Sequence, residues 1–296
     1  MASVATLKSK RRTVVSIDGR LVAGGQARIG IDDWGFRYGW GAFETIRVSG
    51  GQPVFLERHL ERFGRTARAL LLTGEDEAKW WRRSTVTVLS HAGRGERVLN
   101  LYWTRGEAPL FHGRRILCLR PLSAPSHAEA RIWIAPWRIG AGVPGIGAKT
   151  LAYLPYTFSS ICAAEADCTD AILLNSRGKV ADGSSASVFL IAEGRLLTPP
   201  LTDGALPGIT RGVVMELASQ SGIPVRQISL TQKRLESADG IFLTSSLRGL
   251  RAVTRVNEQK VSMSADARRI FLRIKRAYAA EVARDVALFR NQGATA

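Results

Sequence analysis

The sequence predicts an α/β protein, or an α+β protein with mixed sheets, folded as two lobes. Three observations support this class. Strand-like and helix-like apolar patterns alternate along the chain, and a glycine-rich segment interrupts them near the middle. The third is length, because 296 residues are enough for one large domain or two of ordinary size. An apolar fraction of 45% with 23% charged residues is typical of a globular protein.

The first lobe is predicted to begin with two hairpins and a helix. The stretch 13–22, TVVSIDGRLV, places Asp18-Gly19 between β-branched residues, which favours a tight turn between two strands. The stretch 41–56 repeats this pattern, with Ser49-Gly50-Gly51 as the turn. A helix is expected over about 56–72, because apolar side chains recur there at helical spacing.

The remaining elements follow in an alternating order. The first lobe continues with a tryptophan-containing helix near 76–92 and strands at 97–106, 114–122 and 130–137. The second lobe is predicted to contain a helix at about 151–165, strands at 171–176, 187–194 and 195–199, a helix at about 208–221, strands at 224–230 and 240–246, and a terminal helix from about Ala265. Glycines and one proline at 138–147 mark the connection. The predicted domains are therefore 1–137 and the larger 148–296, joined by the loop 138–147.

The formal charge of +17 raises the question of a nucleic-acid partner. The basic residues are mostly arginine and are spread along the chain, with only short clusters such as 8–12. No zinc-finger spacing, aromatic RNA-binding signature or helix-turn-helix accompanies them. A solvated basic surface is therefore favoured, and it would also attract an anionic small substrate. A basic nucleic-acid-binding protein without catalysis stays a distant alternative.

Cysteine usage and apolar runs indicate a cytoplasmic protein. Cys118, Cys162 and Cys168 are too few and too scattered for a disulfide framework or a zinc site, so no metal is expected. No apolar run reaches the roughly 20 residues of a membrane span, and the N-terminus lacks the order of a secretory signal. We therefore expect a reduced compartment and no membrane partner.

One lysine stands out because of its surroundings. Lys149, in IGAKTLAYL, is the single charged residue between Ile139 and Ala164. Desolvation disfavours the charged form of a lysine. Lys149 therefore either reaches water or serves as a neutral amine.

Two segments of the first lobe could bind a ligand, and each has an ordinary structural interpretation. The glycines of WGFRYGWGAFETIRVSGG could let the backbone wrap a ligand, or they could be turn glycines. In ERHLERF, Arg58 and Arg62 lie four residues apart on one helix face. Arginine suits phosphate binding, but the two could instead form solvated ion pairs with Glu57 and Glu61.

Three segments of the second lobe leave a similar choice. Ile209 and Thr210 in LPGITRG begin a helix whose free amides could bind an anion, or they form a simple capped start. The hydroxyl cluster 244–246 could hold a phosphate or carboxylate, or end a strand. Asp182 in KVADGSSASVF could pair with a protonated ring nitrogen, or be a turn aspartate.

Taken together and in order, these segments resemble the class IV, or fold-type IV, pyridoxal-phosphate enzymes, over about residues 17–256. That family includes branched-chain and D-amino-acid transaminases and aminodeoxychorismate lyase. The resemblance implies that pyridoxal phosphate binds between the lobes. It also implies that Lys149 is the Schiff-base lysine and moves the substrate proton as base and acid. The other cofactor-binding residues that it implies are Arg62, Ile209, Thr210 and Ser246 at the phosphate and Asp182 at the pyridine nitrogen.

The sequence departs from the family pattern at three positions. The family usually has glutamate where Asp182 stands and commonly asparagine where Ala152 stands. D-amino-acid transaminases hold the substrate carboxylate with an arginine and a histidine two residues later, after a TRG strand end. Here TRGEAPLFHG keeps His112 but has Leu110 at the arginine position, which counts against a D-amino-acid transaminase.

The segments YGWGAFETIRVSGGQPVFLERHLER and TSSLRGLRAV look most like the aminodeoxychorismate lyase branch. This resemblance implies conversion of 4-amino-4-deoxychorismate to 4-aminobenzoate and pyruvate, a step toward folate. Arg248 is a plausible partner for the substrate's carboxylates, and the predicted substrate-binding residues are Phe43, His112, Leu247 and Arg248. A branched-chain or D-amino-acid transaminase is the alternative within the family. A homodimer is expected by resemblance.

Overall fold

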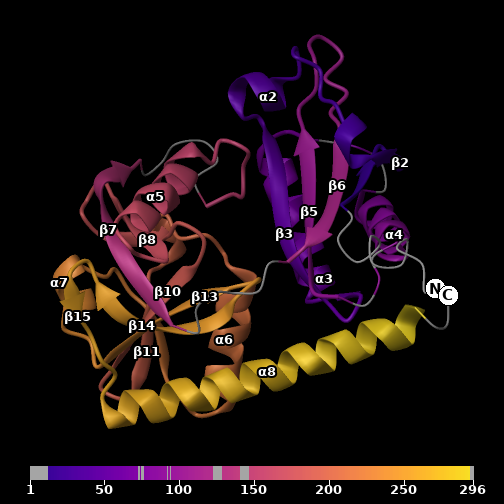
Figure 1. Ribbon diagram of the computed structural model, residues 1–296. Helices are drawn as coiled ribbons and strands as arrows, with labels where there is room; N and C mark the ends of the chain where they lie inside the picture. Colours follow the sequence, from indigo (N-terminus) through magenta and orange to yellow (C-terminus); the bar gives the residue numbers. More distant parts are fainter. Residues whose placement is uncertain are drawn as a thin grey trace, which may run out of the picture. The chain divides into compact units, whose positions relative to one another are not determined.

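A computed structural model of the chain describes residues 13–72, 74, 77–91, 93, 95–122, 129–140 and 147–293 (Figure 1). The chain divides into two compact units. The first unit holds Met1–Ala124, Ala148–Ala152 and Val282–Ala296, and the second holds Pro125–Gly147 and Tyr153–Glu281. The basic cluster 8–12 and most of the predicted connection, 141–146, lie outside the described residues.

The first unit is built on a six-stranded antiparallel sheet with the strand order β2-β1-β6-β5-β3-β4. Its strands are β1 (Val14–Ile17), β2 (Arg20–Ala23), β3 (Gly41–Ser49), β4 (Gln52–Pro53), β5 (Arg97–Thr104) and β6 (Arg115–Pro121). Its helices are the short η1 (Gly24–Gln26), α2 (Trp34–Tyr38), α3 (Leu56–Ala69) and α4 (Glu77–Leu89).

Both predicted hairpins are confirmed. Asp18 and Gly19 have φ values of 51° and 84° between β1 and β2, and Gly50 and Gly51 have 58° and 85° between β3 and β4. Positive φ at both central residues matches the right-handed twist of the strands, which explains why these residue types occupy the turns.

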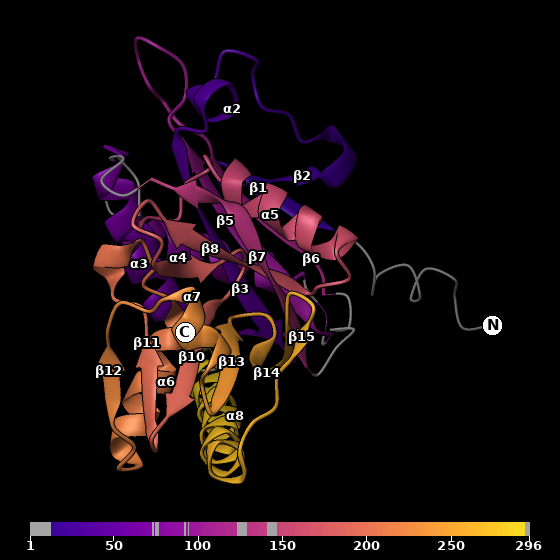
Figure 2. The ribbon, with the colours of Figure 1, turned by 90° about the vertical axis from the view of Figure 1, so that its left-hand side faces the viewer.

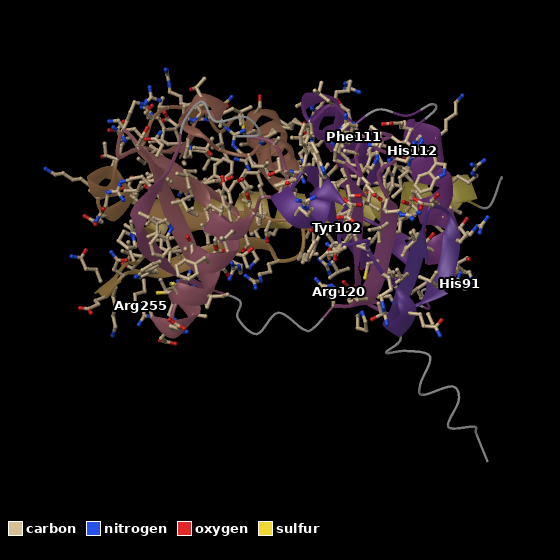
Figure 3. The ribbon with its side chains drawn as sticks, turned by 90° about the horizontal axis from the view of Figure 1, so that it is seen from above. His91, Tyr102, Phe111, His112, Arg120 and Arg255 are labelled. Carbon is tan, nitrogen blue, oxygen red and sulfur yellow. The ribbon has the colours of Figure 1, made fainter. Side chains whose placement is uncertain are left out.

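Helices α3 and α4 cover one face of this sheet, packing on β3, β6 and β1. The core between them is apolar and rich in large rings, with Phe63 stacked edge-on against Trp81 at 4.9 Å. Because side chains alternate along a strand, Tyr102 points away from this core while its neighbour Trp103 points into it. Figure 3 shows Tyr102 near Arg120 of the adjoining strand β6.

The second unit contains a nine-stranded mixed sheet. The strand order is β12-β11-β10-β13-β14-β7-β8-β9, with β15 paired to β14. The first five run side by side in Figure 2. Three pairs are parallel, β11 with β12, β14 with β7 and β7 with β8, and the others are antiparallel. The bounds are β7 (Ala130–Ile139), β8 (Asp170–Asn175), β9 (Val180–Gly183), β10 (Ser187–Ala192), β11 (Arg195–Thr198), β12 (Val225–Gln227), β13 (Gly240–Ser245), β14 (Gly249–Val256) and β15 (Gln259–Lys260).

The predicted helices of the second half are confirmed, with α5 (Leu154–Glu165), α6 (Ile209–Gln220) and the terminal α8 (Ala265–Gly293). Short helices η2 (Leu201–Asp203) and α7 (Gln232–Glu236) complete the unit. Helix α5 packs on β7 and β8, and α6 packs on β12 and β13. The fold is thus mixed α/β, as the sequence predicts.

The division into units differs from the predicted domain boundaries in three places. Strand β7 belongs to the second unit because it pairs with β8 and β14. Ala148–Ala152 belongs to the first unit because Lys149 and Leu151 hydrogen-bond to β3. The end of α8 also belongs there, since the Phe55 amide donates to Asp285 at 2.6 Å. Lys149 therefore does not open the second lobe.

Two further observations concern the predicted compartment. All three cysteines, Cys118, Cys162 and Cys168, are free thiols. Within the described ranges, none of the helices combines the length and apolar character that crossing a membrane would require.

Candidate active site

The segment that carries Lys149 is held against the edge of β3. The Phe43 amide donates to the Lys149 carbonyl at 2.9 Å, and the Leu151 amide donates to the Gly41 carbonyl at 2.8 Å. Glycine is required at the contact, because a Cβ at Gly41 would lie 2.6 Å from the backbone carbonyl oxygen of Trp103 as well as against Leu151. These contacts fix the backbone on both sides of Lys149.

A second glycine serves the same contact. A Cβ at Gly39 would lie 2.9 Å from the Cα of Ala152, and Gly39 has a φ of 67° as the C-terminal cap of α2. The glycines of this stretch therefore admit another segment of the chain.

The Lys149 side chain is half-buried and lies over an aromatic ring. Its Nζ is 4.2 Å from the centroid of the Phe43 ring. The ring face attracts a cation and offers a neutral amine an apolar wall. Phe43 in turn stacks on Tyr102, with ring centroids 6.3 Å apart.

A buried ionic cluster lies in the same unit. Arg62 donates from Nε and Nη2 to the two carboxylate oxygens of Glu44, each at 2.7 Å, and the His59 Nδ1 is 2.8 Å from Glu44 Oε2. Glu44 lies on β3, and His59 and Arg62 lie one turn apart on α3. All three side chains are buried, so Arg62 is not part of a solvated helix face.

The three groups fix one another's charge. Burial alone would raise the pKa of Glu44, but Arg62 and His59 outweigh it and hold the pKa well below its usual range. Burial lowers the pKa of His59, opposed by Glu44, and the positive charges of Arg62 and Lys149 lower it further. His59 is therefore neutral at pH 7 and donates its Nδ1 proton to an ionised Glu44. The Lys149 amide donates to the Thr66 hydroxyl of the same helix at 3.5 Å, so the lysine segment also lies against α3.

In the second unit, Asp182 is a buried carboxylate on β9, and not a turn residue. It is 5% exposed and accepts the amides of Gly183 at 3.1 Å and Leu206 at 2.9 Å. Burial raises its pKa to about 7, although these two amides, Arg211 and Ser187 act against the rise. In the described part of the chain no basic side chain forms an ion pair with Asp182.

Helix α6 begins close to Asp182, which accepts the Leu206 amide two residues before the N-cap of the helix. Gly208 is its N-cap and provides no side chain to accept the amides of the first turn. A Cβ at Gly208 would lie 2.9 Å from Ser187 Oγ. Thr210 is 2% exposed, with its hydroxyl 3.5 Å from that of Tyr278. The helix start therefore offers amides and a buried hydroxyl to an anion.

The turn after β13 carries the third predicted group of the second unit. Strand β13 ends at Ser245, and Ser246, Leu247 and Arg248 form the turn to β14. Arg248 is exposed, and its amide donates to Ser245 Oγ at 3.3 Å. Burial lowers the pKa of the neighbouring Arg251, and the charge of Arg248 lowers it further. The turn therefore presents hydroxyls beside a positive charge.

Comparison of the chain with known proteins identifies the family to which it belongs. Residues 41–256 match the family model described as amino-transferase class IV. The chain belongs to the class IV aminotransferases. These are pyridoxal-phosphate enzymes, so the chain is an enzyme of that cofactor class, and the match favours catalysis over a nucleic-acid-binding role.

Individual class IV aminotransferases agree over most of their length. The bifunctional aminodeoxychorismate lyase / D-amino acid transaminase of Mycobacterium tuberculosis is 28% identical, over 79% of this chain and 88% of that protein. The branched-chain aminotransferase of Thermoproteus uzoniensis has a TM-score of 0.82 at 25% identity, over 89% of this chain and 93% of that one. A candidate 4-amino-4-deoxychorismate lyase from Legionella pneumophila has a TM-score of 0.74 at 29% identity, over 84% and 94%.

Taken separately, each unit carries side chains that suit one part of the cofactor of class IV aminotransferases. An amine over an aromatic ring, Lys149, suits an aldehyde, and the uncapped start of α6 with Thr210 suits a phosphate. Asp182 is a buried carboxylate that forms no ion pair with a basic side chain among the described residues, which suits a protonated ring nitrogen. These roles remain assignments from the resemblance.

The predicted site residues fall into the two units as two groups. Phe43, Arg62, Lys149 and His112 belong to the first, and Asp182, Ile209, Thr210, Ser246, Leu247 and Arg248 belong to the second. In the first group Phe43, Arg62 and Lys149 cluster, while His112 lies in the β5–β6 loop (Figure 3).

Sequence reasoning missed the partners that hold these residues. Glu44 and His59 stand beside predicted residues in FET and RHLER, but no local pattern pairs positions 15 residues apart. Asp170, which is fully buried, accepts the Ser184 hydroxyl at 2.7 Å and the Ser185 hydroxyl at 2.8 Å. An acidic residue directly before the apolar strand 171–174 was the available signal for this anchor.

Proposed function

We propose that the chain is a pyridoxal-phosphate-dependent lyase that converts 4-amino-4-deoxychorismate to 4-aminobenzoate and pyruvate. The observation that carries the proposal is Arg248, an exposed cation on the turn that also bears Ser246. A substrate with two carboxylates needs cationic partners, and Leu110 offers none where D-amino-acid transaminases have an arginine. Similarity to the mycobacterial and Legionella proteins supports the same choice.

In this proposal the residues of the chain have separate tasks. The phosphate is held by Arg62, by the backbone amides that begin at Ile209, and by Thr210 and Ser246. Asp182 keeps the ring nitrogen protonated. When bound, pyridoxal phosphate supplies the electron sink for the reaction. Lys149 removes the proton from the amine-bearing carbon of the substrate. The bond between the ring carbon and the oxygen of the enolpyruvyl group then breaks and the ring becomes aromatic. The released enolpyruvate takes up a proton, which balances the one removed by Lys149, and becomes pyruvate.

Phe43 and Arg248 position the substrate in this scheme. The Phe43 ring lies beneath Lys149 Nζ, so it limits where the amine can move and keeps water from one side of it. Arg248 binds a carboxylate, together with Leu247 and His112 as the remaining substrate-binding residues. We also propose that the enzyme works in the cytoplasm as a homodimer, which sedimentation of the purified protein would test.

Pyruvate release tests the lyase. The purified enzyme receives 4-amino-4-deoxychorismate without any keto acid, and we expect pyruvate and 4-aminobenzoate in equal amounts. Arg248→Gln is expected to raise KM about 10-fold or more because a carboxylate contact is lost. Arg226→Gln, an exposed arginine on β12, is the matched control. Absence of pyruvate from the unaltered enzyme would rule the lyase out.

The alternative is a branched-chain or D-amino-acid transaminase, favoured by the match to the Thermoproteus uzoniensis branched-chain enzyme. It requires a keto acid and yields ping-pong kinetics. Amino-group transfer from a panel of L- and D-amino acids to 2-oxoglutarate, without pyruvate release from aminodeoxychorismate, would select it.

Lys149 can be tested separately from the substrate. Lys149→Ala is expected to remove the visible absorbance band of the purified protein and to lower activity by about 10³-fold or more. Lys260→Ala, on the exposed β15, should keep both. An unchanged visible band in Lys149→Ala would contradict the assignment.

A further inference from the structure

One cavity of the first unit lies away from Lys149, and His112 is the one predicted substrate-binding residue on its wall. Its volume is about 640 Å³, within the range of small-molecule sites, and neither Phe43 nor Lys149 lines it. Its walls include Trp80 of α4, Trp103 of β5 and the β5–β6 loop with Phe111 and His112. Phe43 pairs with Tyr102 across the strands, so Trp103 occupies the opposite face of the sheet.

Arg115 lines this cavity with its guanidinium close to two aromatic rings. The guanidinium carbon is 4.9 Å from the Trp80 ring centroid and 5.4 Å from that of Trp103. Cation–π attraction to both rings helps to hold the guanidinium at the cavity wall. In the part of the chain that the structure describes, the Arg115 side chain has no ion pair with a carboxylate.

Glu77 lies beside Arg115 but does not neutralise it. Its Oε1 is buried without a hydrogen-bond partner among the described residues. Burial raises the pKa of Glu77 to about 7, although Arg115 and Arg68 act against the rise. The positive charge of Arg115 is thus incompletely balanced.

Arg105 repeats this arrangement at the other end of the loop. Its guanidinium carbon is 4.4 Å from the Phe111 ring centroid and 5.5 Å from that of Trp40. Its Nη1 donates to the Leu71 carbonyl at 2.9 Å, while its Nε is buried with no partner within the described ranges. A buried unsatisfied donor is costly, so a ligand oxygen here would be stabilised.

Among the described residues that line the cavity, positive charges outnumber negative ones. The third arginine, Arg114, is already paired with Asp18 at 2.8 Å, and Asp18 also accepts the backbone amide of Arg115. Two guanidinium groups that have no carboxylate partner among the described residues therefore face a cavity with aromatic walls. This combination selects an anion with a flat apolar body.

We propose that this cavity binds an aromatic carboxylate, at a site separate from the one around Lys149. The carboxylate pairs with Arg115 and Arg105, and the ring lies among Trp80, Trp103 and Phe111. The proposal does not depend on which reaction the enzyme catalyses.

Calorimetric titration with benzoate tests the site, using the full-length protein loaded with cofactor. Benzoate is expected to bind the unaltered protein and the Lys149→Ala variant equally. Benzamide has the same shape without the charge, and acetate has the charge without the ring. Each is expected to bind at least about 10-fold more weakly.

Variants of the two arginines locate the binding. Arg115→Gln and Arg105→Gln are each expected to weaken benzoate binding about 10-fold or more, while Arg114→Gln, the matched control, should stay within about twofold. Thermal unfolding shows whether each variant is folded. If a glutamine variant is not folded, the lysine variant at the same position replaces it, for example Arg115→Lys. Loss of benzoate binding in Lys149→Ala, or equal affinity in all three glutamine variants, would overturn the proposal.

Discussion

Glu44 in the first unit and Asp182 in the second are both buried carboxylates on β-strands, yet their charges at neutral pH differ. Glu44 accepts two bonds from Arg62 and one from His59, and its pKa is held far below the usual range. Asp182 accepts only uncharged donors, and burial raises its pKa to about 7. Burial therefore does not determine the charge state, and the partner does.

The difference suggests different tasks for the two carboxylates. The charge of Glu44 is satisfied within the unit, so Glu44 is suited to fixing Arg62 in place. The carboxylate of Asp182 has no ion pair among the described residues, and a protonated ring nitrogen would provide one. Binding such a group would lower the pKa of Asp182 and make it an anion at pH 7.

The largest expected effect comes from breaking the paired carboxylate. Arg62→Met should lower the free energy of unfolding by about 3–5 kcal/mol, because it leaves Glu44 charged and buried without its main partner. Urea unfolding of the cofactor-free protein at pH 7 measures this. Arg65→Met, which removes an exposed partner of Glu61 on the same helix, should cost less than about 1 kcal/mol.

A double variant distinguishes charge from packing. Glu44→Gln combined with Arg62→Met should recover part of the loss, since no buried charge then remains. A double variant as unstable as the sum of its two single variants would contradict the pairing argument.

Removing the charge of Asp182 should change the stability of the protein in the opposite direction. The pKa of Asp182 is 3.8 in an unfolded chain and about 7 when folded, so its contribution is full below pH 3.8 and is lost as pH rises toward 7. Asp182→Asn should therefore gain stability relative to the unaltered cofactor-free protein between pH 4 and pH 8, by at most about 4 kcal/mol.

Glu44→Gln provides the comparison for that experiment. The folded pKa of Glu44 is lowered, so its contribution is present above about pH 4.5 and is lost as pH falls. This variant should be less stable than the unaltered protein at pH 7, and the deficit should shrink in acid. Parallel pH profiles for Asp182→Asn and Glu44→Gln would remove the contrast between the two carboxylates.

A third carboxylate sharpens the comparison, because Asp170 belongs to the same unit as Asp182 but also has a charged partner, Arg251, at 3.4 Å. Ser184→Ala removes a buried hydroxyl that donates to Asp170 at 2.7 Å and should cost about 1.5–3 kcal/mol in urea unfolding. Ser185→Ala removes an exposed donor to the same carboxylate and should cost less. Equal losses would show that burial of the hydroxyl is immaterial.

The smallest expected effect concerns the helix that carries His59 and Arg62. Asp285 of α8 accepts the amide of Phe55, the N-cap of α3, at 2.6 Å. Asp285→Ala should lower stability by about 1 kcal/mol, the usual loss for a helix cap. Asp266→Ala, an exposed position in the first turn of α8, is the control and should be near neutral. A larger loss in the control would contradict the capping role.

Local chemistry accounts for the parts of this fold that the sequence predicts well. Asp18-Gly19 and Gly50-Gly51 fix their hairpins because few other residues accept positive φ at both turn positions. The long helix α3 follows from apolar periodicity. The motif residues Lys149, Asp182 and Thr210 were predicted as site residues from a family pattern, and their roles stay predictions.

Contacts between distant segments account for what the sequence did not predict. Strand β14 carries Arg251 in a buried position, although an arginine in the sequence suggests an exposed stretch. Its partner is Asp170, which lies 81 residues earlier in the chain and 3.4 Å away in the structure. Lys149 was expected to open the second lobe, because its neighbours in the chain lead there. Backbone bonds to Gly41 and Phe43 assign it to the first unit, and no local pattern encodes them.

The contact of Gly39 and Gly41 with Leu151 and Ala152 has a consequence for protein engineering. A lysine loop taken from another class IV aminotransferase would bring its own side chains at 151 and 152 against these glycines. At a fixed backbone, the exchanged loop would fit only where its side chains occupy no more space than those of Leu151 and Ala152. Chimeras should transfer residues 39–43 and 149–152 together, as a single cassette cut from two places in the gene.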